Sequence, residues 1–153
     1  MKTAVVHYLL KEFWNSVTLC GLPLFYLLFI LILFQFSPLQ HTETALIMFV
    51  ALELFCFLLK VMIPKKRPET TIKRIYVTLY HERSFPSVHT ARISLLAIIV
   101  LTLFPTNLFL TSLFLLLVIF VGYSRVFLRE HDFVDISGGV FVGILFGMIW
   151  RMF

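Results

Sequence analysis

Long apolar runs separated by short polar segments dominate this sequence and strongly restrict the folds open to it. The runs cover residues 17–36, 45–63, 87–104, 108–123 and 134–150. Because a helix needs about 20 apolar residues to cross a bilayer, each run predicts a transmembrane helix. The chain is 60% hydrophobic with a mean hydropathy of +0.98, whereas soluble domains are roughly 45–50% apolar. We therefore predict an all-α integral membrane helical bundle of about five transmembrane helices, forming one domain over residues 1–153.

The N-terminal segment, residues 1–15, has a more mixed pattern. Its apolar side chains recur near helical spacing at Val5, Val6, Leu9, Leu10, Phe13 and Trp14. This pattern predicts an amphipathic helix that lies in the membrane interface, with Trp14 at the level of the lipid headgroups. A second short surface helix is predicted at residues 72–79.

The loop of residues 64–87 is the only long polar segment. A loop of this length in so compact a chain is more often functional than a simple connector. Counting the spans places this loop, residues 1–15 and the stretch 124–135 on one membrane face. The connections at 37–44 and 105–107 are predicted to be a polar loop and a tight turn on the other face. We therefore expect the active-site face to consist of residues 64–87 and 124–135.

A glycine repeat marks the last apolar run. Gly139, Gly143 and Gly147 recur every four residues. Glycine at this period lets helices approach closely in lipid, so we expect another helix to pack against this face.

The stretch 124–135 concentrates charge and one imidazole at the end of an apolar run, which is expensive in a membrane and marks a functional candidate. If a helix begins near His131, Asp135 lies one turn further along the same face. A carboxylate there can accept the proton of one ring nitrogen and leave the other nitrogen free to attack. Arg125 adds a planar, permanent cation suited to phosphate oxygens. The stretch predicts a nucleophilic histidine, its orienting acid and an anion clamp.

Three motifs occur in order along the chain. They are Lys60, six intervening residues and Arg67-Pro68; then Pro86-Ser87-Val88-His89; then Ser124-Arg125, five residues, His131, three residues and Asp135. Together they resemble the tripartite signature of the type 2 phosphatidic acid phosphatase family, which shares its site with vanadium haloperoxidases. Any one motif is a weak signal, but three in order on one predicted face form a strong one.

The resemblance implies a role for each matched residue. His131 would attack phosphorus and form a phosphohistidine, with Asp135 fixing its tautomer. His89 would protonate the leaving oxygen and then activate water. The phosphoryl oxygens would be held by Lys60, Arg67, Arg125 and Ser87, with Ser124 as a further candidate. No metal or other cofactor is expected, because three cations already neutralise the phosphoryl charge.

Val88 is the one departure from the signature, since the family has glycine there. Glycine permits a positive φ or a close approach of the backbone to phosphate, and valine is costly at positive φ. The valine therefore bears on the geometry of this turn and on backbone donation to phosphate, while no catalytic side chain is lost.

The charged residues outside the motifs include single residues within apolar runs and cations in the polar segments. Arg92 lies one turn after His89, which predicts either a second contact to an anionic substrate group or an ion pair. Glu53, inside an apolar run, is expected to pair with a neighbouring polar group. The remaining cations are predicted to form a solvated surface facing lipid headgroups: Lys65, Lys66, Lys73, Arg74, Arg83 and Arg129.

The predicted function is metal-independent dephosphorylation of a membrane lipid. The scarcity of residues outside the membrane predicts a shallow site that suits a large headgroup, so the 1-phosphate of lipid A is the first candidate. Undecaprenyl pyrophosphate, phosphatidylglycerol phosphate and phosphatidic acid are the alternatives that the resemblance implies. The rival class is a non-catalytic membrane protein that binds or transports anionic lipids, and a vanadate-dependent haloperoxidase is a third hypothesis.

The formal net charge of +5 is compatible with nucleic acid, anionic lipid or an anionic substrate as partner. With most of the chain in a lipid bilayer, nucleic acid is excluded, and no obligatory protein partner is evident. The excess of Lys and Arg on the motif face favours a cytoplasmic site, but a phosphate site itself requires several of those cations. The resemblance implies a multi-pass protein of the bacterial inner (cytoplasmic) membrane with a periplasmic active site, and we expect this orientation.

Overall fold

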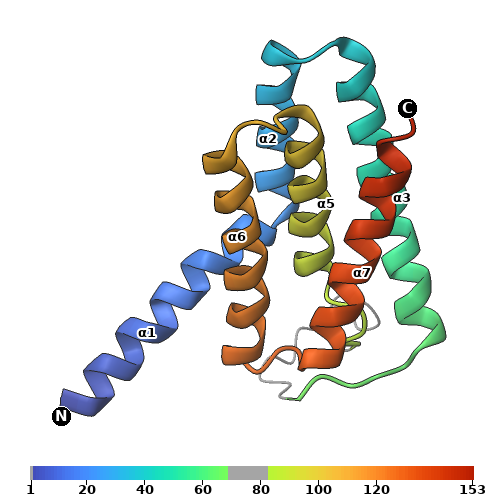
Figure 1. Ribbon diagram of the computed structural model, residues 1–153. Helices are drawn as coiled ribbons and strands as arrows, with labels where there is room; N and C mark the ends of the chain where they lie inside the picture. Colours follow the sequence, from blue (N-terminus) through green and yellow to red (C-terminus); the bar gives the residue numbers. More distant parts are fainter. Residues whose placement is uncertain (1, 69–82) are drawn as a thin grey trace.

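The computed structural model describes residues 2–68 and 83–153, and within that part of the chain the fold is a bundle built from helices. In chain order these are α1 (Lys2–Thr18), a 3-10 turn η1 (Leu19–Gly21), α2 (Pro23–Phe36), α3 (Leu39–Met62), α5 (Val88–Leu103), α6 (Leu108–Phe127) and α7 (Phe133–Trp150). Helices α2 to α7 run alongside one another while α1 projects away from them (Figure 1). The predicted all-α bundle is confirmed, and the helix predicted at 72–79 lies outside the described residues.

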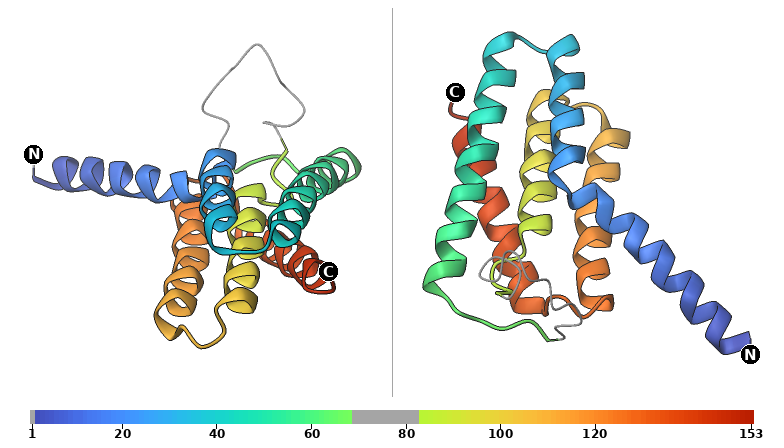
Figure 2. Two further views of the ribbon diagram at one scale, coloured as in Figure 1. Left: turned by 90° about the horizontal axis from the view of Figure 1, so that it is seen from above. Right: turned by 180° about the vertical axis from the view of Figure 1, so that it is seen from behind.

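Helix α5 is the central element of the bundle and is buried along most of its length. It contacts α2, α3, α6 and α7 as well as η1, and Figure 2 shows these elements around it. Apart from His89, Arg92 and small hydroxyl residues its sequence is apolar on all sides, which is the pattern of a helix without a solvent-facing side. Because Ser87 and His89 stand at its first turn, the central helix also carries one of the three motifs into the site.

Glycines let α7 pack directly on α5, as the repeat at Gly139, Gly143 and Gly147 predicts. A Cβ atom added to Gly139 would lie 2.3 Å from the carbonyl oxygen of Ser87, and one on Gly143 would lie 2.3 Å from that of Ala91. No side chain fits at either position, so the two backbones touch. This contact fixes the start of α5 beside the start of α7.

The span predicted at residues 17–36 is bent at Pro23, a residue expected to kink a helix, and its first residues belong to the N-terminal helix. Helix α1 continues to Thr18, and α2 begins at Pro23 after a bend of 50°. Proline lacks a backbone N–H and disfavours the helical conformation of the residue before it. Leu22 accordingly has φ −76° and ψ 154°. The N-terminal helix is therefore longer than the predicted 1–15, and α2 alone has 14 residues.

Two other boundaries differ from the predicted ones. Residues 37–44 are not a loop throughout, because α3 begins at Leu39. Within it the hydroxyl of Thr44 donates to the carbonyl oxygen of Gln40 at 2.7 Å, which accommodates a polar side chain inside a helix. Helix α6 runs past the predicted end at residue 123 to Phe127, so the Ser-Arg pair of the third motif lies on its last turns.

Among the described residues, three helices are long and apolar enough to cross a membrane, namely α3, α6 and α7. The bent pair α1 and α2 makes a fourth if it counts as one span, and α5 is apolar but has only 16 residues. By length and composition the described residues thus contain three or four candidate spans, beside the shorter apolar helix α5, where about five spans were predicted. The exposure of large apolar side chains along the helices, such as Leu31, Leu54 and Phe141, fits a lipid-facing surface.

Candidate active site

The three motif segments meet at one end of the bundle. The chain segments 63–68, 83–87 and 128–132 lie at the lower end in Figure 1, and the connections at 37–38 and 104–107 lie at the opposite end with the C-terminus. This is the arrangement that counting the spans predicts. Residues separated by as many as 75 positions in the sequence, from Lys60 to Asp135, therefore come within reach of one another.

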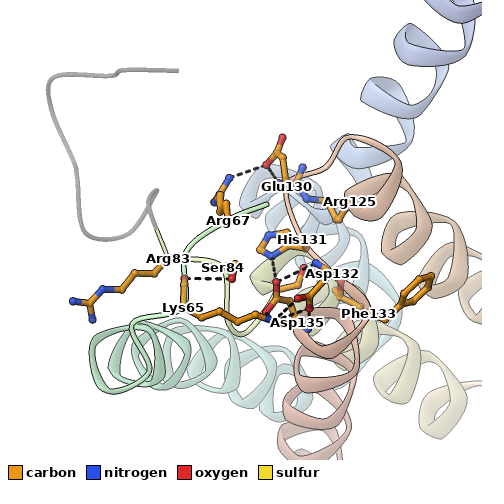
Figure 3. Close-up of polar contacts among 12 residues, drawn as sticks. Lys65, Arg67, Arg83, Ser84, Arg125, Glu130, His131, Asp132, Phe133 and Asp135 are labelled. Atoms are coloured by element: carbon orange, nitrogen blue, oxygen red, sulfur yellow. Dashed lines mark hydrogen bonds and ion pairs between the residues drawn. The ribbon is translucent and has the colours of Figure 1, made fainter. Parts of the chain in front are cut away.

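His131 and Asp135 form the first part of the site. Asp132 caps α7, because its carboxylate accepts from the backbone N–H of Asp135 at 3.0 Å while that of Asp135 accepts from the N–H of Asp132 at 3.1 Å. This reciprocal cap holds the Asp135 carboxylate with its Oδ2 atom 3.5 Å from Nδ1 of His131 (Figure 3). Both side chains are buried. Since Nδ1 faces the carboxylate, Nε2 is left for another partner.

Burial has a clear electrostatic effect on His131. Removal from water, aided by the positive charges of Arg125, Arg67 and Lys60, lowers the pKa of this imidazole to about 4, against the opposing effect of its contact with Asp135. The ring is therefore neutral at pH 7, the state in which a ring nitrogen has a lone pair available for attack.

Lys65 belongs to the site, so its predicted place on a solvated surface is wrong. Its Nζ atom donates to Oδ1 of Asp132 at 2.7 Å and to Oδ1 of Asp135 at 2.8 Å (Figure 3). Partial burial disfavours the charged amine, but the two carboxylates outweigh this and raise the pKa of Lys65. The same contact lowers the pKa of Asp132. Spacing in the sequence contained no signal for this pairing, because the two segments meet only in the folded chain.

Arg67 and Arg125 converge on one carboxylate that sequence reasoning did not select. Nη1 of Arg67 donates to Oε2 of Glu130 at 2.9 Å, and Nη2 of Arg125 donates to the same oxygen. Arg125 is 4% exposed, whereas the side chain of Glu130 is 34% exposed. The Nε atoms of both arginines are buried and have no hydrogen-bond partner among residues 2–68 and 83–153. Two guanidinium groups therefore share one oxygen and retain unused donors.

Lys60 approaches the same region from the end of α3. It is 2% exposed, and its Nζ atom donates to the carbonyl oxygen of Arg83 at 2.7 Å. Arg83 in turn donates through Nη1 to the carbonyl oxygens of Lys60 and Val61, each at 2.6 Å. Arg83 is thus a tether between two loops, and its predicted role as a solvated surface cation is wrong. Lys60 lies close enough to interact electrostatically with Arg67 and Asp135.

Ser87 and His89 flank the start of α5. The backbone N–H of Ser87 donates to the carbonyl oxygen of Asp135 at 3.0 Å, and its hydroxyl pairs with that of Thr90 at 2.9 Å. The serine thereby ties the second motif to the third. His89 interacts electrostatically with Arg125 and His131, which places the two histidines in one site.

Val88, the departure from the family signature, is accommodated without backbone strain. It is buried as the first residue of α5. Among the described residues, Arg129 is the only non-glycine residue with a positive φ, at 56°. Position 88 therefore does not need the positive φ that glycine permits, and the effect of valine on backbone donation to phosphate stays a prediction.

Arg92 makes the ion pair that is one of its two predicted interactions. Its Nε and Nη2 atoms donate to the two carboxylate oxygens of Glu53 at 2.5 and 2.8 Å. Its Nη1 atom donates to the carbonyl oxygen of Gly21 at 3.0 Å. Glu53 accordingly has the polar partner expected of it. A contact between Arg92 and a second anionic group of the substrate remains a prediction.

No cluster of three or more His, Cys, Asp and Glu side chains suited to a metal ion occurs in residues 2–68 and 83–153. The side chains that gather around His131 are mostly cations, namely Lys60, Lys65, Arg67 and Arg125. Such a set suits an anionic ligand.

Fold and site together define a helical membrane enzyme built to hold an anion beside a buried histidine. A sequence profile described as the PAP2 superfamily matches residues 41–153. Because this region covers most of the chain and all three motifs, the protein belongs to the PAP2 superfamily. It is a multi-pass membrane phosphatase of lipid phosphate monoesters.

Two solved structures are similar to the chain. The crystal structure of Aquifex aeolicus LpxE has a TM-score of 0.79 at 21% identity, covering 95% of this chain and 87% of that one. The crystal structure of the first transmembrane PAP2 type phosphatidylglycerolphosphate phosphatase from Bacillus subtilis has a TM-score of 0.77 at 23% identity, covering 94% of this chain and 75% of that one. At these identities the likeness establishes a shared fold.

Proposed function

We propose that the enzyme removes phosphate from its lipid through a phosphohistidine on His131, without a metal ion. The observation that carries this proposal is the position of His131. Its Nδ1 atom faces the buried carboxylate of Asp135 at 3.5 Å, and the neighbouring arginines retain unpaired donors. An oriented neutral imidazole beside an incompletely satisfied cation pair is what nucleophilic attack on a phosphoryl group requires.

In the first step, Nε2 of His131 attacks phosphorus and the bond from phosphorus to the lipid oxygen breaks. The leaving oxygen takes a proton from His89, and Asp135 stabilises the positive charge that develops on the imidazole. In the second step, His89 takes a proton from water as the water oxygen attacks phosphorus. The bond from phosphorus to nitrogen breaks, which releases inorganic phosphate and restores His131.

The phosphoryl group is held by cations from two different segments. Arg67 and Arg125 already converge on a single anionic oxygen, and Lys60 lies nearby as a third cation. Ser87 contributes a hydroxyl, which pairs with that of Thr90. These groups neutralise the charge that spreads over the phosphoryl oxygens in the transition state.

The 1-phosphate of lipid A is the first candidate substrate. Most of the chain lies in the helices and few residues are available to cover the site end, which favours a large disaccharide headgroup. Phosphatidylglycerol phosphate is supported by the printed name of the similar Bacillus subtilis structure. Undecaprenyl pyrophosphate and phosphatidic acid are the other candidates.

We place the enzyme in a bacterial inner membrane with its site on the periplasmic face. The similar structures come from bacteria. The cations that would otherwise indicate a cytoplasmic face include Lys60, Lys65, Arg67 and Arg125, which the site itself uses. A reporter enzyme fused after Phe153, at the opposite end of the bundle, tests this: reporter activity on the cytoplasmic side supports a periplasmic site, and activity on the periplasmic side overturns it.

The test of the proposed reaction is phosphate release in detergent from the four candidate lipids, with a chelator present. Wild type is compared with His131→Ala and with the control His7→Ala, a change on exposed α1. Release that survives the chelator and the control but disappears in His131→Ala supports the metal-free histidine mechanism, and the best substrate identifies the lipid. Lipid binding without release by folded wild type would favour the rival, a non-catalytic lipid-binding protein.

A further inference from the structure

Glu130 occupies the pair of arginines that the proposed reaction assigns to phosphate. Its Oε2 atom accepts from both Arg67 and Arg125, as described above (Figure 3). The carboxylate therefore stands beside His131, where the phosphoryl group of the substrate has to bind. We infer that Glu130 is an internal competitor for the two arginines: its carboxylate binds them when phosphate is not bound and rotates away when phosphate binds. The inference rests on the proposed function, since that assigns these arginines to phosphate.

The carboxylate satisfies the two arginines only in part. Both hydrogen bonds go to one oxygen, and the Nε atoms of Arg67 and Arg125 stay buried without a partner. A phosphate monoester presents three free oxygens and carries a charge of about −1.5 to −2 at pH 7, against −1 for a carboxylate. Phosphate can therefore bond donors that Glu130 leaves unused, and it gains more from the two positive charges. Glu130 is therefore a weaker ligand for the two arginines than phosphate is.

The movement required of Glu130 is small. Its backbone N–H donates to the carbonyl oxygen of Arg125 at 3.1 Å, and the N–H of His131 donates to the same oxygen at 3.2 Å. The main chain is thus anchored at both residues. The side chain of Glu130 is 34% exposed, so its carboxylate has water on one side. Rotation of the side chain releases the arginines without displacing the nucleophile.

An internal competitor weakens the binding of every anion that needs the same arginines, by one common factor. Substrate phosphate and product phosphate are affected alike. The carboxylate thus raises the KM for the lipid and at the same time helps inorganic phosphate to leave. This is a means of limiting product inhibition in a site that contains several cations.

The test is the binding of inorganic phosphate to the full chain in detergent, measured by isothermal titration calorimetry. Glu130→Gln removes the charge and keeps the shape, so it is expected to bind phosphate about tenfold more tightly than wild type, as is Glu130→Ala. The matched control is Glu43→Gln, an exposed carboxylate near the start of α3 at the other end of the bundle. Its affinity should equal that of wild type.

The opposite role for Glu130 predicts the opposite sign. If the carboxylate only orders the two arginines for substrate, its removal weakens phosphate binding, and that result overturns the inference, as does an unchanged affinity. In the double variant Arg67→Gln/Glu130→Gln, the gain from losing Glu130 should shrink, because one of the contested donors is gone. Phosphate binding is measured without turnover, so a failure of the proposed lipid reaction would be seen separately in the release assay.

Discussion

The molecule contains two arginine–glutamate clusters near the site that differ in how completely they are satisfied. In the cluster behind His89, Arg92 uses all three of its nitrogen positions on Glu53 and the Gly21 carbonyl. The second cluster lies beside His131, at a place that we call the mouth of the site. There Arg67 and Arg125 both donate to one oxygen of Glu130 and keep buried donors unpaired. Buried polar groups normally have hydrogen-bond partners, so the second cluster has donors available to bind an anion.

The difference separates a structural ion pair from a binding site, although residue types alone do not distinguish them. A bidentate pair with both carboxylate oxygens in use gives specific geometry and leaves little for a ligand to gain. A pair of arginines that share one acceptor gains from any anion with more oxygens. Substitutions should therefore affect turnover at the mouth and stability behind His89.

The largest expected effect is on turnover at the mouth. Arg125→Gln should reduce kcat/KM for lipid phosphate release by about 10²–10³-fold, since it removes a donor to the charged transition state. The fold should persist, because Glu130 is partly exposed and keeps Arg67 as a partner. The control is Arg151→Gln, an exposed cation at the far end of the bundle. A variant that unfolds in proportion to its lost activity would contradict the contrast between the clusters.

The next effect concerns stability behind His89. Glu53→Leu leaves the guanidinium of Arg92 buried without its carboxylate, which should cost about 3 kcal/mol of unfolding free energy and lower the Tm in detergent. The double variant Glu53→Leu/Arg92→Leu should recover most of that loss, because no lone charge remains. If the single variant keeps its Tm and loses phosphate binding instead, Arg92 is a ligand and the contrast fails.

The buried imidazole makes stability at the mouth sensitive to pH. The pKa of His131 is about 4 in the folded chain and about 6.5 when unfolded. Between these values the unfolded chain binds more protons, so stability falls as the pH drops from 6.5 toward 4, by up to about 3 kcal/mol. Unfolding of wild type and His131→Asn should be compared across this range. The variant is expected to lose less stability, and parallel curves would show that His131 is not the responsible group.

The smallest effect tests Gly21, which lies against both Arg92 and His89. Gly21 accepts from Arg92, and a Cβ atom added to it would lie 2.7 Å from Cβ of His89. Gly21→Ala should therefore displace His89 and reduce kcat by about tenfold. Gly122→Ala is the control, because its nearest contact is a methyl group of Ile136 at 3.1 Å. Equal losses in both variants would indicate general packing damage.

Much of the fold could be predicted from the sequence, because apolar runs specify helices and polar connections specify ends. The departures arise at residues whose effect depends on neighbours. Pro23 breaks an apolar run whose hydropathy is uniform. The polar residues after Leu39 were expected in a loop from their polarity, but they form the first turns of α3. Hydropathy does not indicate which helices pack closely. The glycine repeat of α7 does, because close packing of two helices needs positions without side chains.

The candidate site could be predicted as far as the motifs reach. The four-residue spacing predicted that His131 and Asp135 lie together, and the structure has them 3.5 Å apart, with Asp135 in the first turn of α7 and His131 just before the capping residue Asp132. Lys65 was missed because its partners Asp132 and Asp135 come from another segment of the chain, about which spacing within one segment contains no information. Glu130 was missed although one of its partners, Arg125, lies five residues earlier in the same segment, because its other partner, Arg67, is brought to it only by the fold. The roles given to the motif residues remain predictions for the assays above.

The contact between α5 and α7 also constrains how a lipid can enter and leave. Where Gly139 and Gly143 face Ser87 and Ala91, the two backbones meet with no space for even a methyl group. A hydrocarbon tail cannot pass between these helices, so this side of the bundle is closed to the acyl chains of substrate and product. Lateral diffusion of the lipid must therefore bring its headgroup to His131 from another part of the bundle's perimeter.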